Sequence, residues 1–218
     1  MIKFCTFFTS SHASLYKEFM NSFPYEEDVD LIIRYLPQES DGVYESDTWN
    51  KTMYKKMTYI VDYMKSLKEN EYFLHADIDI RFYRNFKKDI IDLYNASGKD
   101  ILFQNDGYEL CMGFFICKYN EKIIKMMEYV RDNLNKFAQD QKAVNSLLPQ
   151  TSIKYGILPE RYYNFGPTNG LIRWNPGIQN FYVPKDIVLH HANWTVGIEN
   201  KINIIKAVKN IYDNQIKC

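Results

Sequence analysis

Two aspartates separated by one residue are the part of this sequence best suited to chemistry, and they follow the apolar segment 72–76 (Y-F-L-H-A). The segment has the composition of a strand, and an extended backbone points residues i and i+2 to the same side, so Asp77 and Asp79 can bind one ligand together. Adjacent carboxylates repel each other and are costly to desolvate, which a hard divalent cation between them offsets. A cation held there implies a phosphate-bearing partner. The alternative interpretation is an acidic, solvated strand end without a metal.

The composition limits the class of protein. With 218 residues the chain is long enough for one core and is most simply a single domain over residues 1–218. The 27 basic residues balance the 27 acidic ones, so we expect no nucleic-acid partner and no general attraction to an anionic membrane. No apolar run approaches the roughly 20 residues that cross a bilayer. Four cysteines without C-x-x-C spacing, in a chain without a secretory leader, predict free thiols and a cytoplasmic location.

Segments with strand and helix patterns alternate along the chain. Strands are expected at 2–8, 30–36, 72–76, 101–104, 113–117 and 187–189. Helices are expected from the polar turn after the first strand to about residue 20, and then at 47–68, 85–95, 120–137, 140–149 and 199–212. A polar loop over residues 38–46 and an aromatic-rich loop region over residues 159–182 interrupt the alternation. This order predicts an α/β fold with a mostly parallel central sheet flanked by helices.

Several polar residues fall at the predicted strand ends. Ligands of open α/β sheets bind at the carboxyl ends of the strands, so such residues are expected to meet at one edge of the sheet. Those that fall just past a predicted strand are Thr9, Asp77, Asp79, Asp106 and His191.

A series of short motifs extends this picture. D-I-D follows F-L-H-A, C-M-G-F-F occupies 111–115, D-Q occupies 140–141, L-P occupies 158–159, and H-A-N-W-x-x-G-x-x-x-K runs from His191 to Lys201. In this order the motifs resemble those of the metal-dependent nucleotide-sugar glycosyltransferases of the GT-A fold. The chain is most similar to the compact nucleotide-diphospho-sugar transferases, including small ones of large chlorella viruses. The resemblance covers nearly the whole chain and implies a Rossmann-like GT-A domain.

The resemblance implies a metal site made of Asp77, Asp79 and His191. These residues would hold Mn²⁺ or Mg²⁺ against the donor diphosphate, and an imidazole beside two carboxylates suits Mn²⁺ better. Lys201 would add a second positive charge to the diphosphate. Taken alone, His191 is more readily interpreted as a structural histidine, but its place after a strand, together with D-I-D, weakens that interpretation.

The resemblance also implies donor contacts from separate segments of the chain. Thr9 and Ser10 would meet the nucleotide base or ribose, with Lys56 near them. Asp106 and the turn around Gly113 would face the donor sugar, where the lack of a side chain lets a hydroxylated ring approach the backbone. The other expected donor-binding residues are Asp77, Ile78, Gln141 and Lys201.

The chemistry of transfer leaves two alternatives. If the reaction inverts the configuration of the sugar, a carboxylate must remove the acceptor proton, and Asp140 is the first candidate with Asp106 the second. If the reaction retains configuration, no such base is needed. Asp140 and Gln141 would also bind sugar hydroxyls.

The expected function is transfer of a sugar from a nucleoside-diphosphate sugar to a glycan or glycoprotein. A UDP-sugar is the favoured donor and a GDP-sugar the second candidate, and the aromatic region 162–182 would shape the acceptor site. The enzyme would act in the cytoplasm, which is the host cytoplasm if the protein is viral. Two other functions use the same carboxylates: a metal-dependent phosphoesterase or nucleotidyltransferase, and a non-catalytic nucleotide-sugar binder.

Overall fold

The structure is a computed structural model that describes residues 1–37, 47–137 and 139–217. The polar loop expected over residues 38–46 lies outside the described residues. No helix in the described ranges combines the length and the apolar character needed to span a membrane.

A six-stranded sheet forms the centre, with strand order β2-β1-β3-β6-β5-β7. Its strands are β1 Ile2–Phe8, β2 Val29–Tyr35, β3 Tyr72–Ala76, β5 Ile101–Asn105, β6 Leu110–Lys118 and β7 Tyr155–Ile157. β1 is parallel to β2 and β3, and β5 is parallel to β7, whereas β6 runs antiparallel to β3 and β5. The predicted α/β fold with a mostly parallel central sheet is therefore confirmed.

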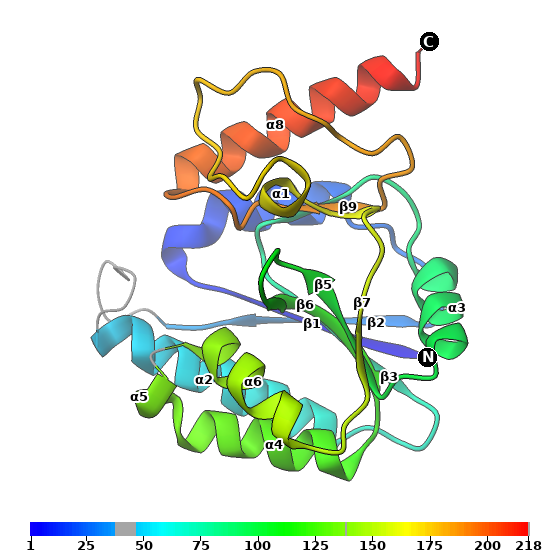
Figure 1. The fold of residues 1–218 in the computed structure, drawn as a ribbon, viewed down its shortest axis with the longest axis vertical. Helices are drawn as coiled ribbons and strands as arrows, with labels where there is room; N and C mark the ends of the chain where they lie inside the picture. The colour runs from blue at the N-terminus through cyan, green and yellow to red at the C-terminus, as the bar shows by residue number, and fades with distance from the viewer. Residues whose placement is uncertain (38–46, 138, 218) are drawn as a thin grey trace.

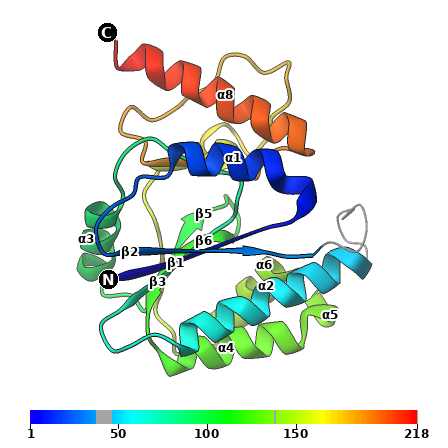
Figure 2. The same ribbon diagram turned by 180° about the vertical axis from the view of Figure 1, so that it is seen from behind.

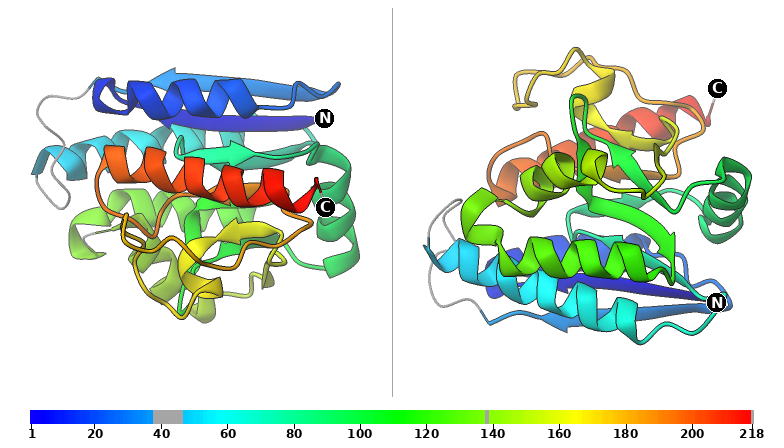
Figure 3. Two further views of the ribbon diagram at one scale, coloured as in Figure 1. Left: turned by 90° about the horizontal axis from the view of Figure 1, so that it is seen from above. Right: turned by 60° about the horizontal axis from the view of Figure 1, so that its bottom comes forward.

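Helices cover both faces of this sheet (Figure 1). One face carries α1 Ala13–Ser22, α3 Lys87–Ser97 and α8 Ile198–Gln215. The other carries α2 Asp47–Lys65, α4 Glu121–Asp132, α5 Leu134–Phe137 and α6 Asp140–Leu147. Figure 2 shows α1 and α8 on the same side of the sheet, and Figure 3 shows α2 beside α4 on the opposite side. The helix predicted over 120–137 is thus divided into α4 and α5, with Asn133 between them.

The two faces arise from the alternation of side chains along the strands. In β3, Leu74 packs into the core under α1 and α3, whereas Phe73 packs into the core under α2 and α4. Both are fully buried. Every residue of β3 is buried, which is the pattern of a strand in a sheet that is covered on both sides.

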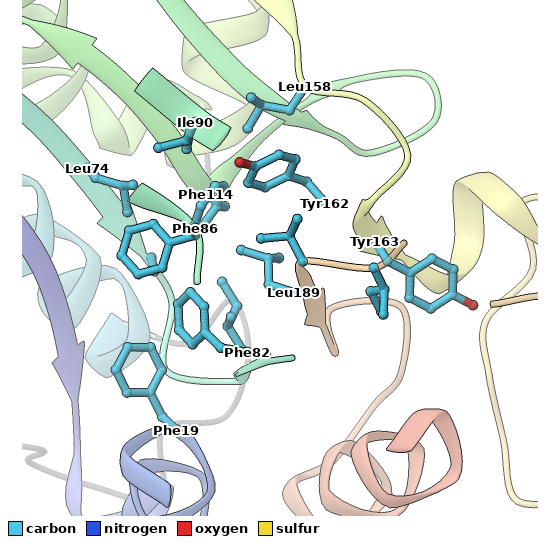
Figure 4. Close-up of a cluster of buried hydrophobic side chains, with 14 of the residues drawn as sticks. Phe19, Leu74, Phe82, Phe86, Ile90, Phe114, Leu158, Tyr162, Tyr163 and Leu189 are labelled. Atoms are coloured by element: carbon cyan, nitrogen blue, oxygen red, sulfur yellow. The ribbon is translucent and has the colours of Figure 1, made fainter. Parts of the chain in front are cut away.

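A second, smaller sheet lies on the α1 and α8 side, with strand order β4-β9-β8. Its strands are β4 Ile80–Phe82, β8 Tyr162–Asn164 and β9 Leu189–His191, and the short helix α7 Phe165–Thr168 follows β8. Figure 4 shows the apolar side chains that fill the space between the two sheets, among them Phe82, Leu189 and Phe114.

The structure differs from the sequence-based expectations in this region. β4 and β8 are strands that the sequence pattern does not predict, and the last strand is β9 rather than residues 187–189. His191 is therefore the final residue of a strand in the small sheet, not a residue past the end of a central strand. Within the aromatic region, Tyr162, Tyr163 and Trp174 are buried core residues, while Tyr182 is exposed.

Candidate active site

One cavity of about 530 Å³ opens where the central sheet and the small sheet meet. It lies at the carboxyl ends of β1, β3 and β5, and the antiparallel β6 places its own beginning at the same edge. Ser10, which was expected to bind the nucleoside, is exposed on the 3-10 turn η1 Ser10–His12 and is not among the lining residues. The expected site residues that do line the cavity are Thr9, Lys56, Asp77, Ile78, Asp79, Asp106, Gly113, Asp140, Gln141, His191 and Lys201.

Asp77, Asp79 and His191 form a group that fits a divalent metal ion. Each offers one ligand atom, and these atoms lie within 4.8 Å of one another. Two carboxylate oxygens and an imidazole nitrogen are a donor set suited to Mn²⁺ and other first-row divalent ions. The backbone fixes their positions, because Ile80 pairs with His191 in the small sheet and the Ala192 N–H donates to the Asp79 carbonyl at 3.0 Å.

Each of the two carboxylates is held by one lysine and one histidine. Asp77 Oδ1 lies 2.8 Å from Lys56 Nζ and 3.2 Å from His75 Nε2. Asp79 forms an ion pair with Lys201 and lies 3.2 Å from His191 Nε2. Burial alone would raise the pKa of both carboxyl groups, but the lysine charge outweighs burial and holds each pKa well below its usual range. Both side chains are therefore ionised and ready to bind a cation.

His191 is buried with both ring nitrogens occupied. Nδ1 lies 2.8 Å from Gln104 Oε1, and Nε2 faces Asp79. Burial opposes the charged ring, but Asp79 outweighs burial and raises the pKa of His191 to about 10. The neighbouring His190 points away and packs against the Tyr163 ring at 5.3 Å, where burial lowers its pKa to about 3. Only one histidine of the pair therefore faces the cavity.

Gly113 lies directly against this metal-binding group. A Cβ atom at this position would stand 2.6 Å from Asp77 Oδ2 and closer still to His191 Cε1. The Asp77 N–H also donates to the Gly113 carbonyl at 2.7 Å. The need for glycine here comes from the lack of space beside Asp77 and His191, not from the backbone conformation.

Asp140 begins α6 and faces the same cavity. Its Oδ1 accepts from its neighbour, the Gln141 N–H, at 2.8 Å, and its Oδ2 lies 3.4 Å from Lys56 Nζ. Oδ2 is buried and accepts no hydrogen bond from the described residues. Lys56 thus lies between Asp77 and Asp140, and although burial alone would lower the pKa of its ammonium group, the two carboxylates raise that pKa above its usual value.

Asp106 is the centre of a separate hydrogen-bond network. Its Oδ1 accepts from Asn164 Nδ2 and Asn193 Nδ2, each at 2.8 Å, and from Trp194 Nε1 at 2.6 Å. Its Oδ2 accepts from Gln141 Nε2 at 2.7 Å. Four neutral donors therefore hold Asp106 in place and connect β5, β8 and α6 with the loop after β9.

Several residues at or behind the cavity were not predicted. His75 and Gln104 are buried polar residues within apolar strands, and their polarity in such strands is the signal that could have identified them. His12 lines the cavity with its Nδ1 2.8 Å from Thr9 Oγ1, and the exposed Arg173 lines its rim. Neither residue belongs to a motif that the sequence makes visible.

The chain belongs to the nucleotide-diphospho-sugar transferase family, whose sequence model matches residues 20–205. Membership of this family makes it a glycosyltransferase, as the sequence motifs predict. No curated protein matches the sequence.

The fold is similar to that of solved glycosyltransferase structures. A glycosyltransferase involved in the glycosylation of the major capsid of PBCV-1 has a TM-score of 0.60 at 14% identity, with 94% of this chain and 98% of that chain covered. The galactosyltransferase LgtC, solved with donor and acceptor sugar analogs, has a TM-score of 0.54 at 13% identity, with 95% of each chain covered. Mouse xyloside xylosyltransferase 1 has a TM-score of 0.53 at 8% identity, with 88% and 98% covered. These similarities show the GT-A fold, which confirms that prediction.

Proposed function

We propose that this glycosyltransferase is metal-dependent and transfers a sugar from a nucleoside-diphosphate sugar to a glycan or glycoprotein. The observation that carries the proposal is the convergence of Asp77, Asp79 and His191 within 4.8 Å at the wall of one cavity. A strand end that simply faces solvent would not bring a buried histidine from the far end of the chain beside its two carboxylates.

The metal-binding role is assigned to Asp77, Asp79 and His191, with Mn²⁺ as the first candidate and Mg²⁺ as the second. When bound there, the ion supplies positive charge that stabilises the leaving nucleoside diphosphate. Lys201 contacts Asp79 and lines the cavity, so its ammonium group can provide further charge to the same diphosphate. Lys56 is held between Asp77 and Asp140, and its charge lowers the pKa of Asp77 despite burial, which opposes this shift.

Asp140 is the proposed general base if the reaction inverts the configuration of the sugar. Its Oδ2 accepts no hydrogen bond from the described residues, so a lone pair is free to accept the acceptor proton. Asp106 already accepts from four donors, which suits a residue that positions its neighbours. If the reaction retains configuration, Asp140 instead binds the donor sugar. The anomeric configuration of the product, read by NMR, decides between the two roles.

The donor is proposed to be a UDP-sugar, with a GDP-sugar second. Thr9, Ile78, Gly113 and Gln141 line the cavity. We assign Thr9 to the base or ribose and the other three to the diphosphate and sugar. For the acceptor, the PBCV-1 relative acts in capsid glycosylation and LgtC was solved with an acceptor sugar analog. Both support a carbohydrate or glycoprotein acceptor, which we place on the side of Arg173 and Trp194.

We propose a cytoplasmic location, in the host cell if the protein is viral. Cys5, Cys111 and Cys117 are buried free thiols, which is consistent with a reducing compartment.

The test is a thermal-shift panel of UDP- and GDP-sugars, each with and without Mn²⁺, followed by assay of the released nucleotide. A ligand that binds the folded state at 100 times its Kd stabilises the protein by about 2.7 kcal/mol. We expect one donor to raise the Tm only when Mn²⁺ is present. Asp79→Asn should abolish this Mn²⁺-dependent rise in Tm, whereas the matched change Asp92→Asn on the outer surface of α3 should not alter it.

The outcomes separate the proposal from its alternatives. Release of nucleoside diphosphate with a transferred sugar supports it. Release of nucleoside monophosphate indicates a phosphoesterase or nucleotidyltransferase, although such enzymes usually gather more carboxylates around two metal ions than the two that join His191 in this group. A donor that binds without any turnover indicates a non-catalytic binder. No stabilisation by any donor with Mn²⁺ contradicts the proposal.

A further inference from the structure

Gln104 carries a buried amide group and follows three apolar residues in β5. It lies in β5 on the same side as Leu102, which packs into the core between the two sheets, and it is fully buried. A buried amide costs free energy unless all of its hydrogen-bonding groups have partners. The partners of Gln104 therefore show what this residue does.

The orientation of the Gln104 amide follows from its surroundings. Its Nε2 lies 3.1 Å from both the Tyr162 and the Tyr163 carbonyl oxygens. Carbonyl oxygens only accept hydrogen bonds, so the NH₂ group must face them. The amide oxygen Oε1 must then face His191 Nδ1, which lies 2.8 Å away.

The amide orientation in turn fixes the His191 ring. Because Oε1 only accepts, His191 Nδ1 must carry a proton. The Cys111 thiol lies 3.7 Å from the same Nδ1, at the limit for a weak sulfur contact. Asp79 favours a second proton on Nε2, and once that proton is lost the ring keeps its proton on Nδ1 and presents the Nε2 lone pair to the side of Asp79 and Asp77. This is the form of histidine that binds a metal through Nε2.

An irregularity in the central sheet sets the position of Gln104. Phe103 pairs with Phe115, but the next residue, Gln104, pairs with Cys111, so residues 112–114 of β6 have no partner on β5 at this step. β-bulges re-aim side chains near active sites. Here both strands of the irregular pair contact the His191 ring, Gln104 of β5 at Nδ1 and Gly113 of β6 beside Cε1.

From these contacts we infer that Gln104 is the positioning residue of the metal site: it holds His191 in the tautomer and orientation that direct Nε2 at the metal. The inference rests on the proposed metal-dependent function. Outer partners of metal-binding histidines typically contribute about 10- to 100-fold to metal affinity. The Gln104 amide is hydrogen-bonded through both its NH₂ group and its oxygen. These bonds join β5 of the central sheet to β8 and β9 of the small sheet.

The first test measures Mn²⁺ affinity by calorimetry or EPR in variants of the full chain. Gln104→Met keeps the length of the side chain but offers no acceptor, and we expect about 10- to 100-fold weaker Mn²⁺ binding. Gln104→Glu keeps an oxygen toward Nδ1 while losing both N–H donors, and we expect its affinity within about threefold of the original. The matched control Gln150→Met, at an exposed glutamine that only donates to the Ser146 carbonyl, should leave affinity unchanged.

A double-mutant cycle separates positioning from general loosening of the structure. If Gln104 acts through His191, Gln104→Met should not weaken Mn²⁺ binding further in the His191→Ala background. Equal weakening in both backgrounds, or equal losses in Gln104→Met and Gln104→Glu, overturns the inference.

A spectroscopic test needs no variant, so it applies even if the substituted proteins fail to fold. With ¹⁵N-labelled histidine and diamagnetic Cd²⁺ bound to the unaltered protein, we expect the His191 proton on Nδ1 and the metal on Nε2. The reverse assignment overturns the inference. If the unaltered protein binds no divalent ion at all, the proposed metal-dependent function fails. Metal binding that is unaffected by the Gln104 substitutions refutes only the inference about Gln104.

Discussion

Replacing Gly113 by alanine is expected to damage metal binding and catalysis far more than folding. The added methyl carbon would lie 2.6 Å from Asp77 Oδ2, about 0.8 Å short of ordinary contact, which begins at 3.4 Å. It would lie closer still to His191 Cε1. Because His191 is held by Gln104 and Asp77 by Lys56 and His75, neither side chain can move without breaking a hydrogen bond.

The expected magnitude follows from this displacement. A misplacement of about 1 Å in a catalytic group costs about 100-fold in rate, which corresponds to about 2.7 kcal/mol in the activation free energy. Overpacking of a filled site costs about 1–3 kcal/mol in the free energy of unfolding. We therefore expect kcat/KM to fall about 100-fold in Gly113→Ala while the protein still folds.

The assay compares Mn²⁺ affinity, kcat/KM and the unfolding midpoint of Gly113→Ala with those of a matched glycine variant. Gly177→Ala is suitable, because its nearest new contact is the Asn175 side chain at 3.0 Å in an exposed loop. It should behave like the unaltered protein in all three measurements. If Gly113→Ala binds Mn²⁺ and turns over donor within about twofold of the unaltered enzyme, the steric reasoning is refuted.

Three further variants probe the rest of the cavity. Asp140→Asn should lower kcat by about 10²- to 10⁴-fold in an inverting enzyme, and a loss below tenfold in steady-state kinetics would exclude it as general base. Asp106→Asn replaces a carboxylate that accepts from four donors. Calorimetry should therefore show a free energy of unfolding about 1–3 kcal/mol lower than that of the unaltered protein. An unchanged Tm would contradict the anchoring role of Asp106. Lys201→Ala removes the ammonium group that competes with a metal ion for Asp79. Mn²⁺ should therefore bind roughly tenfold tighter, while the KM for the donor rises. Weaker Mn²⁺ binding would contradict this competition.

Much of the fold could be predicted because its central strands are short apolar runs bounded by polar residues. The predicted bounds of β1 and β3 agree with the structure. The three-residue strands β4 and β8 could not be predicted, because so short a segment has no period of its own. They become strands only by pairing with β9, a partner distant in the chain. The same pairing explains the shifted bounds of the last strand.

The candidate site could likewise be predicted only in part from the sequence. The spacing of Asp77 and Asp79 is local, so the sequence alone predicts that they act together. The strand-end rule predicted that His191 meets them at one edge, although on a strand of the wrong sheet, and its role as a metal ligand was implied only by the resemblance to a family. The hydrogen bonds of Gln104 and Asp106 join strands from both sheets, and no sequence period reports such contacts. A lone polar residue inside an apolar strand was the available signal for Gln104.

The small sheet has a consequence for how this enzyme can diverge. Asp79 leads directly into β4, and Ile80 is the residue that pairs with His191 in β9, so two metal ligands are spaced by a backbone ladder. A slip of one residue along that ladder would turn the side chains of β9 to the opposite face and carry the His191 ring away from the two aspartates. The loop between α7 and β9 lies outside this ladder. Its length and surface can therefore change while the spacing of Asp79 and His191 is preserved.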